Sequence, residues 1–125
     1  VLTVLVGHTG LVRSLRWAGQ DAQLLSCAED GSVFTWTVPG GQRSCEVVLK
    51  QSCILDQVGT PPDAQDVYVI DEEKTVHQLS DSQVRYSLDL RVSVTAIALS
   101  LDGRLLFFGT KHGHLLSVCY PLDYT

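Results

Sequence analysis

Residues 7–36 read GHTGLVRSLRWAGQDAQLLSCAEDGSVFTW, and this stretch decides the fold. It places a Gly-His pair before one apolar run, a serine inside a second, an Asp-Gly turn after it and a tryptophan near the end of a third. These offsets are typical of strands joined by short turns, because a strand exposes alternate residues on each face and an Asp-Gly turn reverses the chain. We therefore expect four side chains to converge in space: His8, Ser26, Asp30 and Trp36.

The spacing is similar to that of one WD-repeat blade. Such a blade ends in Trp-Asp, and here Thr37 follows Trp36 instead. In a WD blade the Trp indole, the Ser hydroxyl, the His imidazole and the Asp carboxylate form a buried chain of hydrogen bonds. Each bond contributes about 1 kcal/mol net, whereas one stranded buried partner costs about 1–3 kcal/mol. The four residues are therefore predicted to stabilise the blade as a unit.

A serine, a histidine and an aspartate that meet in space are also the residues of a hydrolase. No strand-to-helix turn of the G-x-S-x-G type surrounds Ser26, which lies in the apolar run LLSCA. Trp36 completes the blade pattern and has no role in acyl transfer. The sequence therefore predicts a structural network without a catalytic residue, and a Ser/His/Asp hydrolase is the least favoured of three interpretations.

Two weaker copies of the blade follow at offsets of about forty residues, the WD period. We expect a strand of a preceding blade over 1–6, the intact blade over 7–50, a degenerate blade over 51–89, and a degenerate blade lacking its outer strand over 90–125. The copies do not repeat the four polar residues, so apolar packing is expected to hold them. The predicted fold is all-β: a WD40 β-propeller arc of about three blades of four-stranded antiparallel sheet, an incomplete ring.

Strand positions follow from the apolar runs and the turn residues between them. In the first blade we expect strands near 11–17, 23–28, 32–38 and 45–50, with a Pro-Gly-Gly turn at 39–41. The second blade is expected to hold strands near 53–58, 66–70, 75–80 and 83–88. Those of the third are expected near 93–99, 104–109 and 114–119.

Three partial blades cannot close a ring, since propellers have four to eight blades and each is stabilised by both neighbours. The chain also begins at Val1 without an initiator methionine. We therefore expect it to belong to a longer protein that continues in both directions. An isolated arc exposes apolar faces and unpaired strand edges, so the isolated chain is expected to self-associate.

Composition narrows the class of partner. The 125 residues carry a net charge of −5, which disfavours a nucleic-acid surface. No apolar stretch reaches the roughly 18 residues of a membrane span, and the four cysteines form no CxxC pair. His112 and His114 beside Cys119 have only weak metal-ligand spacing. The sequence thus predicts no nucleic acid, membrane, metal or cofactor, and a reducing cytoplasmic compartment.

Three segments, GHTGLVRSLRW, LLSCAEDGSVFTWTV and GRLLFFGTKHGHLLSVCYPL, resemble the WD-repeat region of the cilia- and flagella-associated protein 57 family. The likeness covers nearly the whole chain. It implies a non-catalytic scaffold of the motile cilium or flagellum axoneme that helps to position inner dynein arms on doublet microtubules, with a coiled coil outside this chain. It also suggests four arginines for contact with acidic tubulin surfaces: Arg13, Arg16, Arg85 and Arg91. The second interpretation is a cytosolic WD-repeat adaptor or substrate receptor outside cilia.

Propellers often bind partners where the loops before the inner strands meet the turns between the second and third strands. Side chains there ring the central opening. By the offsets, the candidate partner-contact residues are Thr9, Leu11 and Glu29 in the first blade, Ile54 and Glu72 in the second, and Ser93 and Lys111 in the third. The alternative is that these positions are ordinary solvated turns.

Overall fold

The structure, a computed structural model, describes residues 4–18, 23–38, 40–49, 52–60, 65–100 and 105–119. Within these ranges the chain forms eleven β-strands and no helix. The first sheet runs in the order β1 (Val12–Ala18), β2 (Gln23–Ala28), β3 (Ser32–Thr37) and β4 (Gln42–Val48). Each neighbouring pair in this sheet is antiparallel.

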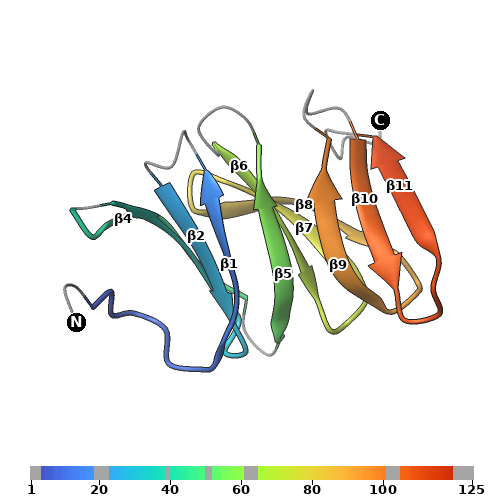
Figure 1. The fold of residues 1–125 in the computed structure, drawn as a ribbon, viewed down its shortest axis with the longest axis horizontal. Helices are drawn as coiled ribbons and strands as arrows, with labels where there is room; N and C mark the ends of the chain where they lie inside the picture. Colours follow the sequence, from blue (N-terminus) through green and yellow to red (C-terminus); the bar gives the residue numbers. More distant parts are fainter. Residues whose placement is uncertain are drawn as a thin grey trace.

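Two further antiparallel sheets follow the same plan. The second consists of β5 (Ile54–Gly59), β6 (Asp66–Asp71), β7 (Thr75–Ser80) and β8 (Gln83–Asp89), and the third of β9 (Val94–Leu99), β10 (Leu105–Thr110) and β11 (Leu115–Cys119). The first strands of the three sheets, β1, β5 and β9, lie next to one another (Figure 1). The chain is therefore the predicted open arc of β-propeller blades. Among the described residues there is no helix with the length and apolar character to span a bilayer.

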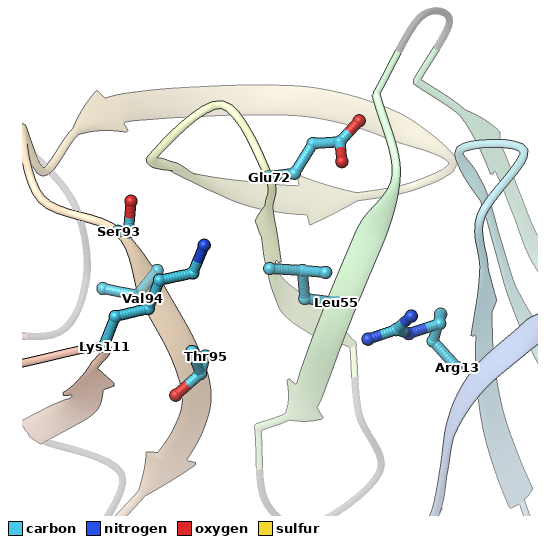
Figure 2. A pocket seen from close by; sticks show the side chains of 7 residues that line it. All are labelled: Arg13, Leu55, Glu72, Ser93, Val94, Thr95 and Lys111. Atoms are coloured by element: carbon cyan, nitrogen blue, oxygen red, sulfur yellow. The ribbon is translucent and has the colours of Figure 1, made fainter.

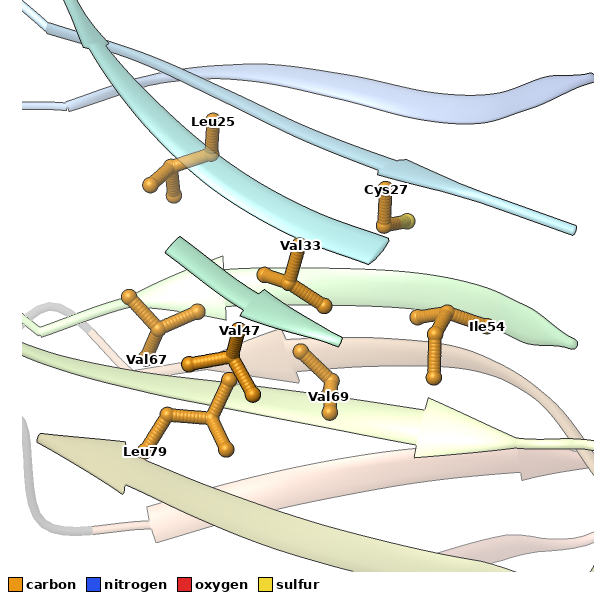
Figure 3. Packing of buried hydrophobic residues seen from close by; sticks show 8 residues of the cluster. All are labelled: Leu25, Cys27, Val33, Val47, Ile54, Val67, Val69 and Leu79. Atoms are coloured by element: carbon orange, nitrogen blue, oxygen red, sulfur yellow. The ribbon is translucent and has the colours of Figure 1, made fainter. Parts of the chain in front are cut away.

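The blades pack face to face through two apolar clusters. The first joins the first and second sheets and consists of Leu25, Cys27, Val33, Val47, Ile54, Val67, Val69 and Leu79 (Figure 3). The second joins the second and third sheets and consists of Tyr68, Ile70, Val76, Val94, Ile97, Leu106 and Phe108. Alternate residues of β6 divide between the clusters, as the period of a strand requires. The middle blade is thus buried on both faces, which explains the unbroken apolar run VYVI at 67–70.

All strands but β4 lie within one residue of the ranges expected from the sequence. The fourth strand begins at Gln42 instead of near residue 45, because the turn before it is tighter than expected. The Gly41 N–H donates to the Thr37 carbonyl over 2.6 Å, and Gly41 has a φ of +75°. Thr37 and Gln42 then form the first pair of the ladder, so pairing starts as soon as the turn closes.

The Asp30-Gly31 turn that the sequence singled out requires its glycine. Gly31 has a φ of +86°, and a Cβ built there would lie 2.0 Å from the carbonyl oxygen of Leu49. That carbonyl belongs to the segment leaving β4, whose Leu49 N–H donates to the Gly31 carbonyl over 2.7 Å. The turn therefore carries both the β2–β3 reversal and the exit of β4.

Residues 4–11 form no strand. The strand expected over 1–6 is thus not present at residues 4–6, and residues 1–3 lie outside the described residues. The segment crosses the first blade instead, where Gly7 lies against the side chains of Phe34, Trp36 and Arg43. This path places His8 and Thr9 beside the β2–β3 turn.

Both ends of the arc present apolar side chains to solvent. On β1, Leu15 is 60% and Trp17 56% exposed, and on β11 Leu115 is 80% exposed. Leu115 occupies the ladder position of Val33 and Val76, which are fully buried by the next blade. Self-association of the isolated chain stays a prediction, and these two faces are where it would occur.

Candidate functional site

The structure brings the four residues of the predicted network together and adds a fifth. Trp36 Nε1 donates to Ser26 Oγ over 2.8 Å, and Ser26 Oγ lies 2.5 Å from His8 Nε2. His8 does not contact Asp30 directly. Its Nδ1 lies 2.5 Å from Ser32 Oγ, and the Ser32 hydroxyl donates to Asp30. Sequence reasoning missed Ser32, although a serine two residues after an aspartate is a common turn partner.

The direction of each hydrogen bond follows from the groups available. An ionised Asp30 only accepts, so the single proton of Ser32 points to it and the Ser32 oxygen accepts from His8 Nδ1–H. Burial lowers the pKa of His8, the nearby Arg43 charge lowers it further, and Asp30 opposes both. The ring is then neutral, and its bare Nε2 accepts from Ser26. One unbroken donor chain therefore runs from the Trp36 indole to the Asp30 carboxylate.

Asp30 is the last acceptor of this hydrogen-bond chain and also binds the segment before β1 that carries Thr9. Its carboxylate accepts from the Thr9 N–H over 2.9 Å and the Thr9 hydroxyl over 2.7 Å, as well as from the Ser32 N–H over 3.1 Å. Burial acts to raise the pKa of Asp30, but the hydrogen bonds from Ser32 and Thr9 hold it well below its ordinary value. The Thr9 hydroxyl is therefore engaged within the blade.

The geometry disfavours nucleophilic chemistry at Ser26. Its side chain is 3% exposed, its proton is directed to His8 and its oxygen accepts from Trp36. A nucleophile must reach a substrate carbonyl from an open position. The arrangement supports the role of a brace between residues 7–9 and the sheet.

The middle blade contains a polar network of its own, which the expectation of apolar packing missed. His77 Nε2 lies 2.8 Å from Asp71 Oδ2, and His77 Nδ1 lies 2.7 Å from Ser87 Oγ. Asp71 is 3% exposed and also accepts from the N–H groups of Glu73 and Thr75. The network joins the β6–β7 turn to β7 and β8.

Acid is expected to destabilise the chain in two steps. The pKa of His8 is lowered from 6.5 by burial, so the contribution of His8 to the free energy of unfolding is complete above pH 6.5. This contribution is lost as the pH falls through the lowered pKa. Burial acts to raise the pKa values of Asp30 and Asp71, but hydrogen bonds hold both below 3.8, so their contributions are lost as pH falls below that value. Urea midpoints measured from about pH 7.5 to about pH 3 check this. The variant His8→Gln should lack the first step, and a wild-type midpoint that rises on acidification would contradict the assignment.

A single carboxylate joins the inner strands of all three blades. Asp56 on β5 accepts from the Ser14 hydroxyl over 2.8 Å, from Arg16 Nη2 over 3.0 Å and from the Ile97 N–H over 3.2 Å. Arg16 Nη2 also donates to the Ile97 carbonyl over 3.0 Å. Arg16 therefore serves as a tie between blades, and its suggested contact with a tubulin surface stays a prediction.

The remaining suggested arginines lie at the surface. Arg13 pairs with Glu29 over 3.1 Å, and Arg85 pairs with Asp81 over 3.3 Å, with all four side chains at least 41% exposed. Arg91 is exposed and adopts a φ of +63° beyond β8. These pairs contribute about 0–1 kcal/mol each, so their charges are open to a partner.

Three equivalent backbone hydrogen bonds align the candidate contact positions. The N–H of Glu29 donates to Leu11, that of Glu72 to Cys53 and that of Lys111 to Ser93, over 2.9, 3.1 and 3.0 Å. We call this row of six residues the turn edge. Glu29, Glu72 and Lys111 are exposed on it, and Leu11 is 62% exposed.

One candidate contact residue is corrected by the structure. Ile54 is fully buried in the cluster between the first two blades. The position equivalent to Leu11 and Ser93 is Cys53, one residue earlier. The register of the degenerate blade was misplaced by one residue, and in a strand such a shift exchanges the two faces.

A recess of about 260 Å³ opens on the turn edge between β1, β5 and β9. Figure 2 shows Arg13 entering it from β1 and Lys111 from the β10–β11 turn, with Leu55 between them. Glu72, Ser93, Val94 and Thr95 complete the lining. In the described part of the chain, neither Glu72 nor Lys111 has an ion-pair partner. The recess thus combines an apolar floor with charges of both signs.

No group of three metal-ligating side chains occurs within the described residues. His112 and His114 are exposed at the β10–β11 turn, whereas the side chain of Cys119 lies outside the described part. The expectation from the sequence that the chain binds no metal therefore stays a prediction.

Comparison with known proteins agrees with the fold. Residues 1–37 match the family described as WD domain, G-beta repeat. The β-propeller domain of Cps50 (Swd1) from Myceliophteria thermophila superposes with a TM-score of 0.82 at 24% identity, covering 93% of this chain and 40% of that one. This likeness shows the propeller fold alone.

Some of the relatives in sequence carry ciliary names. The chain is 38% identical over 98% of its length to cilia- and flagella-associated protein 57 of Mus musculus, and 22% identical over 97% to cilia- and flagella-associated protein 57 C of Tetrahymena thermophila. It is 29% identical over 92% to WD repeat-containing protein 90 of Mus musculus. The chain spans between 6% and 11% of the length of these relatives. It belongs to the WD-repeat β-propeller proteins and is related to cilia- and flagella-associated protein 57 along nearly its whole length.

Proposed function

We propose that the chain forms part of a non-catalytic protein-interaction scaffold of the motile cilium or flagellum, which helps to position inner dynein arms on doublet microtubules. The propeller architecture supports a binding role, since the fold presents loops of several blades on one rigid edge. The ciliary and flagellar names of relatives from mouse and Tetrahymena support the location.

The recess on the turn edge is the observation that carries the proposal. It is formed by three blades, so its side chains are held by rigid sheets. Its free charges, Glu72 and Lys111, stand beside an apolar floor that includes Leu55. A partner surface that fills the floor and meets the two charges would gain both affinity and orientation.

An exchange of charges tests the proposal in the full-length protein. The double variant Glu72→Lys/Lys111→Glu reverses both free charges of the recess without changing the net charge. Lys74→Glu/Asp89→Lys makes the same exchange beside the ends of β7 and β8, where both side chains are exposed and neither lines the recess. We expect the recess variant to lose at least about tenfold in retention on salt-washed axonemes, equal to about 1.4 kcal/mol, and the control to stay within about twofold.

Tagged protein imaged in ciliated cells supplies the readout, together with extraction of the axonemes. Equal retention of the two variants would contradict a role for the recess. A wild-type protein that stays in the cytosol and never enters cilia would favour the adaptor or substrate-receptor interpretation instead.

A further inference from the structure

A second recess lies at the opposite strand ends, between the first and second blades. It has a volume of about 230 Å³ and is lined by residues of β2, β3 and β4 and by the β7–β8 turn. The turn edge contains the β2–β3 and β6–β7 turns, so the second recess opens on the other side of the arc. The Glu46 N–H donates to Ser82 Oγ over 3.1 Å and fixes the β7–β8 turn against β4.

Two polar atoms buried at this recess lack an oxygen or nitrogen partner among the described residues. Thr35 is 2% exposed, and its Oγ1 has only the Cys45 sulfur, a weak hydrogen-bond partner, beside it within the described part of the chain. Gln23 Oε1 is likewise buried with no partner among the residues that the structure describes. A stranded acceptor costs about 1–3 kcal/mol, so a group that donates to both atoms would be bound favourably.

The electrostatics of the recess favour a cation. Asp81 contributes a carboxylate with 84% side-chain exposure, and none of the described residues lining the recess is cationic. Arg85 pairs with Asp81 over 3.3 Å, but such a surface pair exchanges readily. The chain as a whole carries a net charge of −5, which also favours a basic partner.

We propose that this recess accepts the arginine side chain of a partner protein. A guanidinium group presents five N–H donors in a flat fork and no acceptor, which matches several separate oxygen acceptors better than the compact ammonium of lysine. The volume is below the roughly 300–1,000 Å³ of small-molecule sites and is of the size of one side chain. Thr35 and Gln23 bind the inner end of the guanidinium, and Asp81 binds at the mouth.

The thiol of Cys45 reports occupancy directly, because Cys45 lines the recess. In the full-length protein, alkylation of each cysteine is followed over time by peptide mass spectrometry. N-acetyl-arginine amide is the probe, and the lysine and citrulline amides are the comparisons. Cys53, on the turn edge, serves as the internal control, and burial keeps Cys27 unreactive by raising its pKa to about 12.

We expect the arginine probe to slow alkylation of Cys45 in a saturable way, by about tenfold at ten times its Kd, with Cys53 unaffected. The lysine amide should protect more weakly and the neutral citrulline amide should not protect. Equal slowing at Cys45 and Cys53, equal protection by citrulline, or no protection of Cys45 up to the solubility limit of the probe would overturn the proposal.

Two variants separate binding from altered packing. Thr35→Val removes the buried hydroxyl without changing the shape of the side chain and should weaken the protection of Cys45 about 5- to 30-fold. Thr95→Val, at the recess on the turn edge, should not weaken it. Gln23→Glu adds a carboxylate and should strengthen it, which damage to the fold would not do. Unchanged protection in both Thr35→Val and Gln23→Glu would also overturn the proposal.

Discussion

Replacing Trp36 with alanine is expected to lower the free energy of unfolding by about 3–5 kcal/mol. Trp36 is 3% exposed, its ring packs edge-on against Phe34 at 5.6 Å, and Arg43 stacks over it at 5.5 Å. The change leaves a cavity and removes the donor to Ser26 at the start of the hydrogen-bond chain. Urea unfolding followed by circular dichroism in dilute solution measures the loss.

The same blade supplies a matched control. Trp17 is 56% exposed on β1, so Trp17→Ala is expected to cost less than about 1 kcal/mol. If Trp36→Ala and Trp17→Ala lowered the urea midpoint equally, the hydrogen-bond chain would not be the brace described above.

Replacing Asp56 with alanine is expected to cost about 2–4 kcal/mol. Asp56 is 8% exposed, and its removal strands the Ser14 hydroxyl and the N–H of Ile97, which is 2% exposed. Arg16 keeps 39% side-chain exposure and can turn to water, which holds the cost below that of a fully buried pair. Because Asp56 contacts β1 and β9 from β5, hydrogen exchange should accelerate in all three inner strands.

Glu29 is the matched control for this change. It also pairs with an arginine, Arg13, at 3.1 Å, but its side chain is 43% exposed. Glu29→Ala is therefore expected to cost less than about 1 kcal/mol and to leave exchange in β5 and β9 unchanged. Faster exchange confined to β5 in Asp56→Ala would contradict the role of Asp56 as a tie between blades.

The first blade could be predicted from sequence because its signals are local. Strand alternation, the Asp-Gly turn and the WD spacing predicted its strands, and the positive φ of Gly31 in the structure is the conformation that such a turn requires. The exception was β4, since nothing in the composition of residues 39–41 shows how tightly that turn closes.

Contacts between blades could not be predicted in the same way. Asp56 stands in the sequence as one acidic residue in a strand, and its partners lie about forty residues away on either side. In the middle blade, His77 takes the ladder position of Phe34 and binds Asp71 instead of packing against an apolar neighbour. Pairings of this kind depend on three-dimensional register, which a degenerate repeat does not reveal.

The candidate site was likewise predicted only in part from the sequence. Glu72, Ser93 and Lys111 were placed on the turn edge by repeat offsets alone, and the structure locates them around one recess. The one-residue error at Ile54 arose where the repeat signal is weakest. The second recess was not predicted, because no motif marks a meeting of two blades.

Site-specific photo-crosslinking in intact cilia tests the proposed use of the turn edge most directly. A photoreactive residue is placed in the full-length protein at the position of Glu72 in the recess or, as the control, at that of Tyr86 on β8, which is 42% exposed and lines neither recess. We expect covalent adducts with axonemal proteins from position 72 and few from position 86. Adducts from position 86 with none from position 72 would contradict the proposed use of the turn edge.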